Sequence, residues 1–343
     1  MEKENSLQSL TLVEHIRLRP QMYIGKLGHG IEEDDGIYTL LKILVDNSVD
    51  EFRAGYGKRI EISWDLVDVS VRDYGRGLPF DSIVPLVTHT GHQGMQSESS
   101  ARCKSVGLNG IGLCTVMALS QDFRIISYRG GKRAEHHFVR GWEVDSKISE
   151  TSEPDGLMVT FVPDRSIFGV SCLFKDSLIE PIARLYAQLN KGLEVSSEEY
   201  YSRNSYLCQD GLRERLEDIQ RCCSASEPFH LVGKYVEIAF LAGTPCTRIE
   251  SYVNGHRTKA GGPHQDALME AFSDHFGAEN FVAVMNIMLE KPEFADQARN
   301  ELSSRYMWER YNEDGKRVHG ESIRTYLKKF ISKELNKKQK NNG

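Results

Sequence analysis

Long apolar runs and paired cysteines are what this sequence lacks. None of its apolar stretches approaches the ~20 residues that cross a bilayer, and the first ten residues, MEKENSLQSL, lack the apolar core of a signal peptide. The seven cysteines form no CxxC pair, and Cys222 and Cys223 are adjacent. They indicate free thiols in a reducing compartment rather than a disulfide framework or a zinc site. We therefore expect a protein that is not inserted in a membrane.

An excess of positive charge is also missing. The formal net charge is -6, so the composition gives no overall electrostatic reason to expect nucleic acid as a ligand. After Lys316, however, lysine and arginine far outnumber aspartate and glutamate. We interpret this basic stretch as a solvated face or the approach to a further domain, in preference to a DNA contact. A length of 343 residues, with 40% hydrophobic and 27% charged residues, favours a soluble globular protein of two domains.

The two best-known phosphate-binding loops are absent. No GK[ST] follows the glycines, which excludes a Walker A loop. Residues 107–112, GLNGIG, have the spacing GxxGxG and follow a polar stretch rather than a strand, which argues against a dinucleotide-binding fold. An apolar helical run, residues 113–119, begins directly after them. Glycines that open a helix present free backbone N–H groups and the positive end of the helix dipole, so this stretch suits phosphate.

The strongest helical pattern covers residues 37–51, IYTLLKILVDNSVDE. Its apolar residues recur at helical spacing and predict one buried face. On another face Ile43, Asn47 and Asp50 stand four and then three residues apart and share one stripe. A mid-helix asparagine beside acidic residues can place its amide oxygen on a metal ion. Taken alone, however, the triplet Asp46-Asn47-Ser48 is better explained as a solvated helix face.

A candidate site for recognising a base follows the next two strands. Residues 59–64 and 67–71 alternate apolar and polar side chains, and the second strand ends at Asp73. A carboxylate there can accept a hydrogen bond from an exocyclic amine such as that of adenine. The glycines of the motif DYGRG, which begins at Asp73, let the backbone approach a flat ring. A hairpin turn would also account for this motif.

The remaining patterns divide the chain into two α+β halves. Residues 15–25 contain Pro20 and Gly25 and predict an irregular strap, whereas residues 88–104 predict a long polar loop of a kind that is usually functional. Further strands in the first half are expected over residues 123–128, 135–139 and 157–162, giving a helix-on-sheet arrangement. Elements of the second half are expected over residues 177–190, 211–219, 234–241, 247–253, 264–276, 280–289 and 321–335.

Three motifs stand in one order: Asp46-Asn47, the DYGRG motif, and GLNGIG after the long loop. Together they resemble the GHKL ATPases, which include gyrase-type topoisomerases, the ninety-kilodalton heat-shock chaperone and histidine kinases. The stretches RPQMYIG, VDNSVDE, RGLP and ALS are more specific and resemble the B subunit of bacterial type II topoisomerases. Residues 25–42 lean toward the topoisomerase IV kind.

This resemblance implies a fold class and a domain organisation. The implied fold is α+β, with a GHKL (Bergerat-type) helix-on-sheet sandwich followed by a ribosomal S5-like α/β transducer domain. The implied domains are an N-terminal arm at residues 1–25, the ATP-binding domain at 26–170, the transducer domain at 171–335 and a basic tail at 336–343.

The resemblance also assigns cofactors and site residues, with ATP and Mg²⁺ as the cofactors. Asn47 matches the magnesium-binding asparagine, and Asp73 matches the aspartate that reads adenine. In residues 294–302, which match a switch loop that reaches the γ-phosphate, Gln297 is kept and Arg299 stands where lysine is usual. The other matches are Arg76, Gly77 and Pro79 at the adenine, Lys104 near the phosphates, and the triphosphate-binding residues Gly107, Leu108, Asn109, Gly110, Ile111 and Gly112.

Three positions depart from the family pattern. Ile43 stands where the family has the glutamate that activates water, and an aliphatic side chain cannot take a proton. Leu157 replaces a threonine near the adenine, and Arg299 keeps the charge of a lysine but not its reach. We therefore assign no catalytic residue and expect nucleotide binding with doubtful hydrolysis.

The function implied is that of an ATP-dependent type II DNA topoisomerase component, an isomerase of the bacterial cytosol and nucleoid. Its gate would dimerise through the N-terminal arm on binding Mg·ATP and close over DNA, with an A-type cleavage subunit as partner. No stretch resembles the TOPRIM domain or supplies a cleavage tyrosine, so the chain alone is not expected to cut DNA. It is expected to be either a fragment or a short paralogue.

Two alternatives stay open. One is a non-hydrolysing module that dimerises on nucleotide, a pseudoenzyme. The other is a different GHKL machine such as MutL or a histidine kinase, against which the arm and the Gln297 loop argue. Whether the reaction is supercoiling or decatenation is not decided by the sequence.

Overall fold

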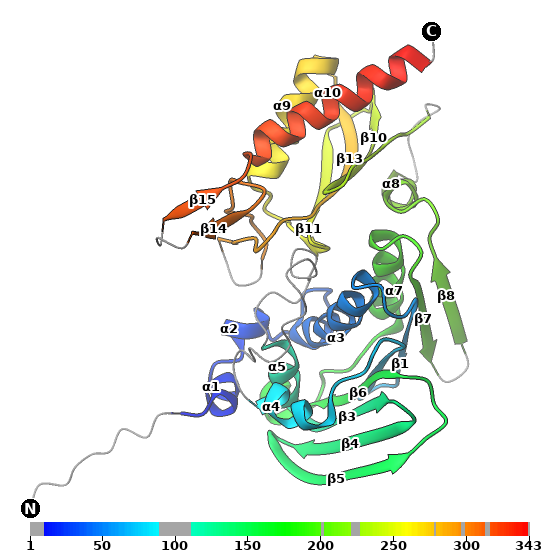
Figure 1. Cartoon of the computed structure of the whole chain (residues 1–343), viewed down its shortest axis with the longest axis vertical. Helices are drawn as coiled ribbons and strands as arrows, with labels where there is room; N and C mark the ends of the chain where they lie inside the picture. Colours follow the sequence, from blue (N-terminus) through cyan, green and yellow to red (C-terminus); the bar gives the residue numbers. More distant parts are fainter. Residues whose placement is uncertain are drawn as a thin grey trace, which may run out of the picture. The chain divides into compact units, whose positions relative to one another are not determined.

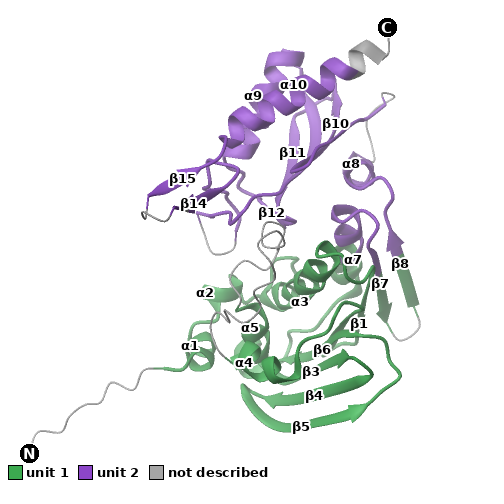
Figure 2. Ribbon diagram, viewed as in Figure 1, with its two compact units in different colours: residues 1–96, 109–182, 196–205 green, residues 97–108, 183–195, 206–343 purple. Residues whose placement is uncertain are grey.

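The computed structural model describes residues 10–88, 111–199, 202–220, 227–277, 279–295, 299–312 and 316–341. It divides into two compact units, one of residues 1–96, 109–182 and 196–205, the other of residues 97–108, 183–195 and 206–343 (Figure 2). Each unit has its own sheet and is described by itself. No helix in the described ranges is both long and apolar enough to cross a membrane.

An eight-stranded sheet forms the base of the first unit (Figure 1). Its strand order is β5-β4-β3-β6-β2-β1-β7-β8, and the pairs from β5 to β1 are antiparallel. The strands are β1 (Arg59–Trp64), β2 (Val69–Asp73), β3 (Ser120–Arg129), β4 (Lys132–Val139), β5 (Trp142–Glu150), β6 (Gly156–Pro163), β7 (Glu194–Glu199) and β8 (Ser202–Leu207).

The helix over this sheet that matters most is α3 (Gly36–Arg53). Its apolar stripe is buried, as the helical spacing predicts, with Ile37, Leu40 and Leu41 fully covered. The other helical elements are α1 (Leu12–Leu18), α2 (Gln21–Ile24), the 3-10 turn η1 (Phe80–Ser82), α4 (Ile83–Thr88), α5 (Gly112–Ala118), α6 (Arg165–Phe168) and α7 (Asp176–Leu189). The division between the two units falls within α7, after Ile182.

The prediction that residues 15–25 form an irregular strap is wrong, because α1 and α2 occupy most of this stretch. Thr11 and Glu14 form a capping box that starts α1 at Leu12, and Ile16, one turn further on, is fully buried. Pro20 does not break a helix here but stands directly before α2, where its fixed backbone angle is tolerated.

The second unit packs helices against a five-stranded sheet of order β12-β11-β13-β10-β9. β13 runs parallel to β11 and antiparallel to β10, and its seven residues are all buried. The elements are α8 (Leu212–Gln220), β9 (Phe229–Val232), β10 (Val236–Ala242), β11 (Arg248–Val253), β12 (His256–Arg257), α9 (Pro263–Phe276), β13 (Phe281–Ile287), β14 (Glu309–Tyr311), β15 (Arg317–His319) and α10 (Ile323–Asn341). Both units are thus α+β, as predicted.

Candidate nucleotide site

A buried carboxylate lies at the centre of the candidate site. Asp73 is the last residue of β2, a strand held between β1 and β6, and it is only 3% exposed. Its Oδ1 accepts hydrogen bonds from the backbone N–H groups of Gly75 (2.9 Å) and Leu157 (3.2 Å). Its Oδ2 lies 3.2 Å from the Ser48 hydroxyl of α3, which can donate to it. The carboxylate is therefore fixed in direction by three elements, and Oδ2 can accept a further donor.

Burial raises the pKa of Asp73 to about 6, against the lowering effect of the three hydrogen bonds. The negative charge of Glu51 acts in the same direction as burial. A ligand that donates a hydrogen bond to such a carboxyl group stabilises the ionised form of the group.

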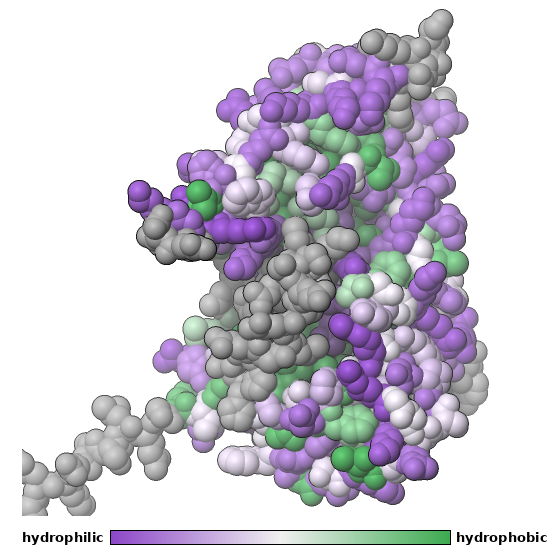
Figure 3. Space-filling model, viewed as in Figure 1, coloured by the Kyte–Doolittle hydropathy of each residue, from purple (hydrophilic) through white to green (hydrophobic). Residues whose placement is uncertain are grey.

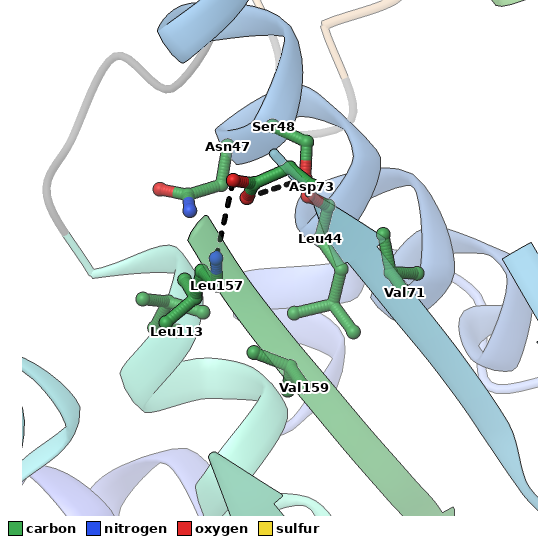
Figure 4. Close-up of a pocket in the computed structure, with 8 residues that line it drawn as sticks. All are labelled: Leu44, Asn47, Ser48, Val71, Asp73, Leu113, Leu157 and Val159. Atoms are coloured by element: carbon green, nitrogen blue, oxygen red, sulfur yellow. Dashed lines mark hydrogen bonds between the residues drawn. The ribbon is translucent and has the colours of Figure 1, made fainter. Parts of the chain in front are cut away.

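An apolar pocket lies beside this carboxylate (Figure 4). Asn47 of α3 and Asp73 of β2 both line the pocket, and Asn47 contributes an amide side chain to the lining. Within the described parts of the chain, the Asn47 amide makes no hydrogen bond, so its oxygen can serve as a ligand of a metal ion. The remaining lining residues are Leu44, Ser48, Val71, Leu113, Leu157 and Val159.

Ile43 lies one helical turn before Asn47 and contacts the start of α5. A Cβ built on Gly112, the first residue of α5, would lie 2.8 Å from Cγ2 of Ile43. Ile111 precedes it as the N-cap residue, with no side-chain cap. The structure thus places Ile43, which the resemblance matches to the general-base position, next to the described end of the GLNGIG motif.

The residues after Asp73 form a tight turn against the sheet. Gly77 has φ +65°, and a Cβ there would lie 2.4 Å from the carbonyl oxygen of Tyr128, so only glycine fits. Arg76 does not line the pocket: its guanidinium donates to both carboxylate oxygens of Glu51 (3.0 and 2.8 Å) and lies over the ring of Tyr56. Pro79 precedes η1 and is also not part of the pocket lining.

Several of the predicted site residues lie outside the described residues: Lys104, Gly107, Leu108, Asn109, Gly110 and Gln297. Arg299 is described and belongs to the second unit. Its Nη1 contacts Nε2 of His256 in β12, and its backbone has φ +59°. Because a guanidinium can only donate, His256 accepts in this contact.

Sequence reasoning missed two groups that hold Asp73 in place. Ser48 stands next to Asn47 in the motif VDNSVDE, but the sequence gives no sign that its hydroxyl faces a residue 25 positions away. The Leu157 N–H comes from 84 positions away and contributes its backbone alone, which leaves no trace in the residue type. Glu51, the partner of Arg76, lies in the same motif as Ser48.

Comparison with known families identifies the class of protein that this site belongs to. Residues 32–166 match the family described as histidine kinase-, DNA gyrase B- and HSP90-like ATPase. The matched range contains α3, Asp73 and α5, so the first unit carries an ATPase domain of this family, which implies ATP binding.

The chain is a relative of the B subunits of bacterial type II topoisomerases. It is 35% identical over 315 residues to the B subunit of DNA topoisomerase 4 from Borreliella burgdorferi, a match that covers 88% of this chain and 52% of that protein. It is 27% identical over 342 residues to the B subunit of DNA gyrase from Staphylococcus epidermidis, covering 87% and 52%. The chain therefore spans about half the length of these relatives.

Solved structures agree on the fold. The 43K ATPase domain of Thermus thermophilus gyrase B, in complex with an aminocoumarin, matches with a TM-score of 0.71 at 24% identity, covering 96% of this chain and 90% of that one. The ATP-binding domain of topoisomerase IV from Francisella tularensis matches with a TM-score of 0.67 at 22% identity, covering 96% and 93%. The α+β fold predicted from the sequence, a GHKL domain followed by a second α/β domain, is confirmed.

Proposed function

We propose that this chain is the ATP-binding gate of a type II topoisomerase, the part contributed by its B subunit. The observation that carries the proposal is the buried Asp73 carboxylate, directed by Gly75, Leu157 and Ser48 into an apolar pocket. The apolar walls would face an adenine ring, and the exocyclic amine of that ring would donate to Oδ2. A guanine would present a carbonyl oxygen at that position, which an ionised carboxylate repels.

The triphosphate would extend from this pocket toward Asn47 and the start of α5. Asn47 lines the pocket with an amide that makes no recorded hydrogen bond in the described residues, and this fits an oxygen ligand of Mg²⁺. Bound Mg²⁺ would neutralise phosphate charge. Lys104 and the Gly107, Leu108, Asn109 and Gly110 stretch would contact the phosphates, a role supported by the resemblance of the GLNGIG motif.

Hydrolysis is proposed to be slow. At the position of the family's general base the chain has Ile43, whose side chain contacts Gly112. Asp50 shares the stripe but lies a turn beyond Asn47. Glu51 is held by Arg76 in an ion pair of 2.8 Å and is not free to move to the phosphate. An apolar residue at the general-base position, with neither nearby carboxylate placed to replace it, favours the second candidate, a module that binds ATP and dimerises without efficient turnover.

The wider activity rests on the similarity to longer relatives. We propose that nucleotide closes two copies through the residues before α1, that the closed dimer holds DNA, and that an A-type partner supplies cleavage in the bacterial cytosol. By the resemblance of residues 294–302 to the family's switch loop, Gln297 and Arg299 would contact the γ-phosphate. In that role Arg299 would supply a charge-assisted, forked contact.

Calorimetric titration with a non-hydrolysable ATP analogue tests the nucleotide site. The parent chain is expected to bind the analogue more tightly with Mg²⁺ than without it. Asn47→Ala should retain binding but lose the Mg²⁺ dependence, whereas Asn336→Ala, an exposed change on α10, should behave as the parent. Absence of binding by the folded parent would refute the proposal.

A further inference from the structure

Strand β5 presents an unusual amount of apolar surface at the edge of the first sheet. It is the last strand of the eight-stranded order and pairs with β4 on one side only within the described residues. Trp142, Val144 and Ile148 are 71%, 56% and 62% exposed. Figure 3 shows exposed hydrophobic surface over β4 and β5 at the lower edge of the molecule. An edge strand with a free row of backbone donors and acceptors is a template for pairing with another strand.

We propose that β5 pairs antiparallel with β5 of a second copy of this chain, with Ser146 at the two-fold axis. In this register Val144 lies opposite Ile148 of the partner subunit, and Asp145 lies opposite Lys147 of the partner subunit. The two-fold axis generates a second copy of each of these pairs. Directly opposed apolar and opposite-charge pairs are the units that stabilise neighbouring strands.

The charge pattern selects this register over its symmetric neighbours. Centring the pair on Asp145 would place two aspartates face to face, and centring it on Lys147 would place two lysines face to face. Like charges in directly opposed positions destabilise a strand pair. Neither Asp145 nor Lys147 has an ion pair recorded in the described parts of the chain, so both charges are available to a partner.

A bulge limits the length of the contact. The register of β5 on β4 shifts between His137 and Phe138, where Val144 is the extra residue. Because a bulge bends its strand and leaves the extra residue outside the regular ladder, regular pairing is confined to residues 145–147, and the side chains of Val144 and Ile148 meet at its two ends. Such a contact is smaller than the ~800 Å² per partner of a standard interface, so we expect a dissociation constant on the order of 0.1–1 mM. The contact needs no nucleotide and is separate from the gate.

Charge reversal provides a self-controlled test by sedimentation velocity without nucleotide, over protein concentrations up to the millimolar range. Asp145→Lys and Lys147→Asp should each weaken self-association at least tenfold, because each creates two like-charge pairs. An equimolar mixture of the two variants should associate, and the double variant Asp145→Lys/Lys147→Asp should associate as the parent does. Lys191→Asp, an exposed reversal in a turn of the chain, is the matched control and should leave the parent's behaviour unchanged.

Recovery in the mixture and in the double variant also shows that the single variants are folded. A parent that stays monomeric throughout the range overturns the proposal. So does association that persists in both single variants, that is lost in Lys191→Asp, or that requires residues 1–9, because each of these results assigns the contact to another surface.

Discussion

Ile43 and Gly112 meet at the junction of α3 and α5, where a Cβ on the glycine would lie 2.8 Å from Cγ2 of the isoleucine. Ile43 is one turn from Asn47, and Gly112 begins the helix that follows the glycine-rich motif. An apolar branched side chain at this junction cannot accept a proton from water. This contact is the structural basis of our proposal that the chain binds nucleotide but hydrolyses it slowly.

Replacing the Asp73 carboxylate, which we propose reads adenine, should weaken nucleotide binding. Asp73→Asn keeps the size of the side chain but loses the charged acceptor, and we expect affinity for an ATP analogue to fall by about 1–3 kcal/mol, roughly five- to 150-fold. Calorimetry at pH 7.5 measures it. Asp81→Asn, an exposed aspartate on η1, is the control, and equal affinities for all three proteins would contradict the assignment.

The raised pKa of Asp73 predicts opposite pH dependences for binding and stability. Its pKa is about 6 in the folded chain, compared with 3.8 for an ordinary aspartate. Below pH 6 the carboxyl is mostly protonated and loses the charge that strengthens the hydrogen bonds it accepts, so nucleotide affinity should fall as the pH falls. The folded state holds this proton more tightly than the unfolded state does, so this group's contribution to the free energy of unfolding rises as pH falls from 6 to 3.8.

Titrations and urea unfolding from pH 5 to 8, compared with Asp73→Asn, measure both trends. The variant removes the titrating group, so the difference between the two proteins isolates it from titration of the nucleotide phosphates. Parallel pH profiles for parent and variant would show that Asp73 does not titrate in this range.

Gly77→Ala should destabilise the first unit by more than ~1 kcal/mol. The substitution combines a steric clash with the conformational cost of placing alanine in a left-handed backbone conformation. Its Cβ would lie 2.4 Å from the Tyr128 carbonyl oxygen. Gly130→Ala is the matched control: its φ is +60°, but nothing lies within 4 Å of the added carbon. Urea unfolding should show a larger loss for Gly77→Ala, and equal losses would remove the steric explanation.

The docking of α1 refines the expectation for the arm. Arg17 donates to the Ala118 carbonyl and to Asp164, both at 2.6 Å, and Ile16 is fully buried, so α1 packs on its own chain. Deleting residues 1–9 should leave nucleotide affinity unchanged but abolish dimerisation by a non-hydrolysable analogue in light scattering. A dimer that forms equally well without these residues would show that the arm is not required.

How far the sequence predicted the fold depends on burial. α3 and β1 were predicted within a few residues because each buries one face and so shows a period. β2 is buried on both faces, but its valines at positions 67, 69 and 71 still alternate with polar residues in the sequence. β5 was missed because nearly all of its residues are exposed, which leaves no alternation to detect. The stretch that contains α1 was predicted as an irregular strap because a proline and a glycine follow the helix, although a capping box precedes it.

For the candidate site, the sequence predicted that Asp73 ends a strand, and the structure places Asp73 and Asn47 in one pocket. The directing contacts from Ser48 and from the Leu157 backbone could not be predicted, since they depend on tertiary packing rather than on residue type. The roles of Asn47, Arg299 and the GLNGIG motif stay predictions.

Release of the γ-phosphate from pre-bound Mg·ATP, measured under single-turnover conditions, tests the separation of binding from hydrolysis most directly. The parent should hold ATP with little release, and Ile43→Glu should release phosphate about 10²–10⁴-fold faster, the usual contribution of a positioned base. Ile43→Gln has nearly the same size without a base, and it should stay as slow as the parent. Rapid release by the parent, at a rate that Ile43→Glu does not exceed, would contradict the proposal that Ile43 leaves this gate without its base.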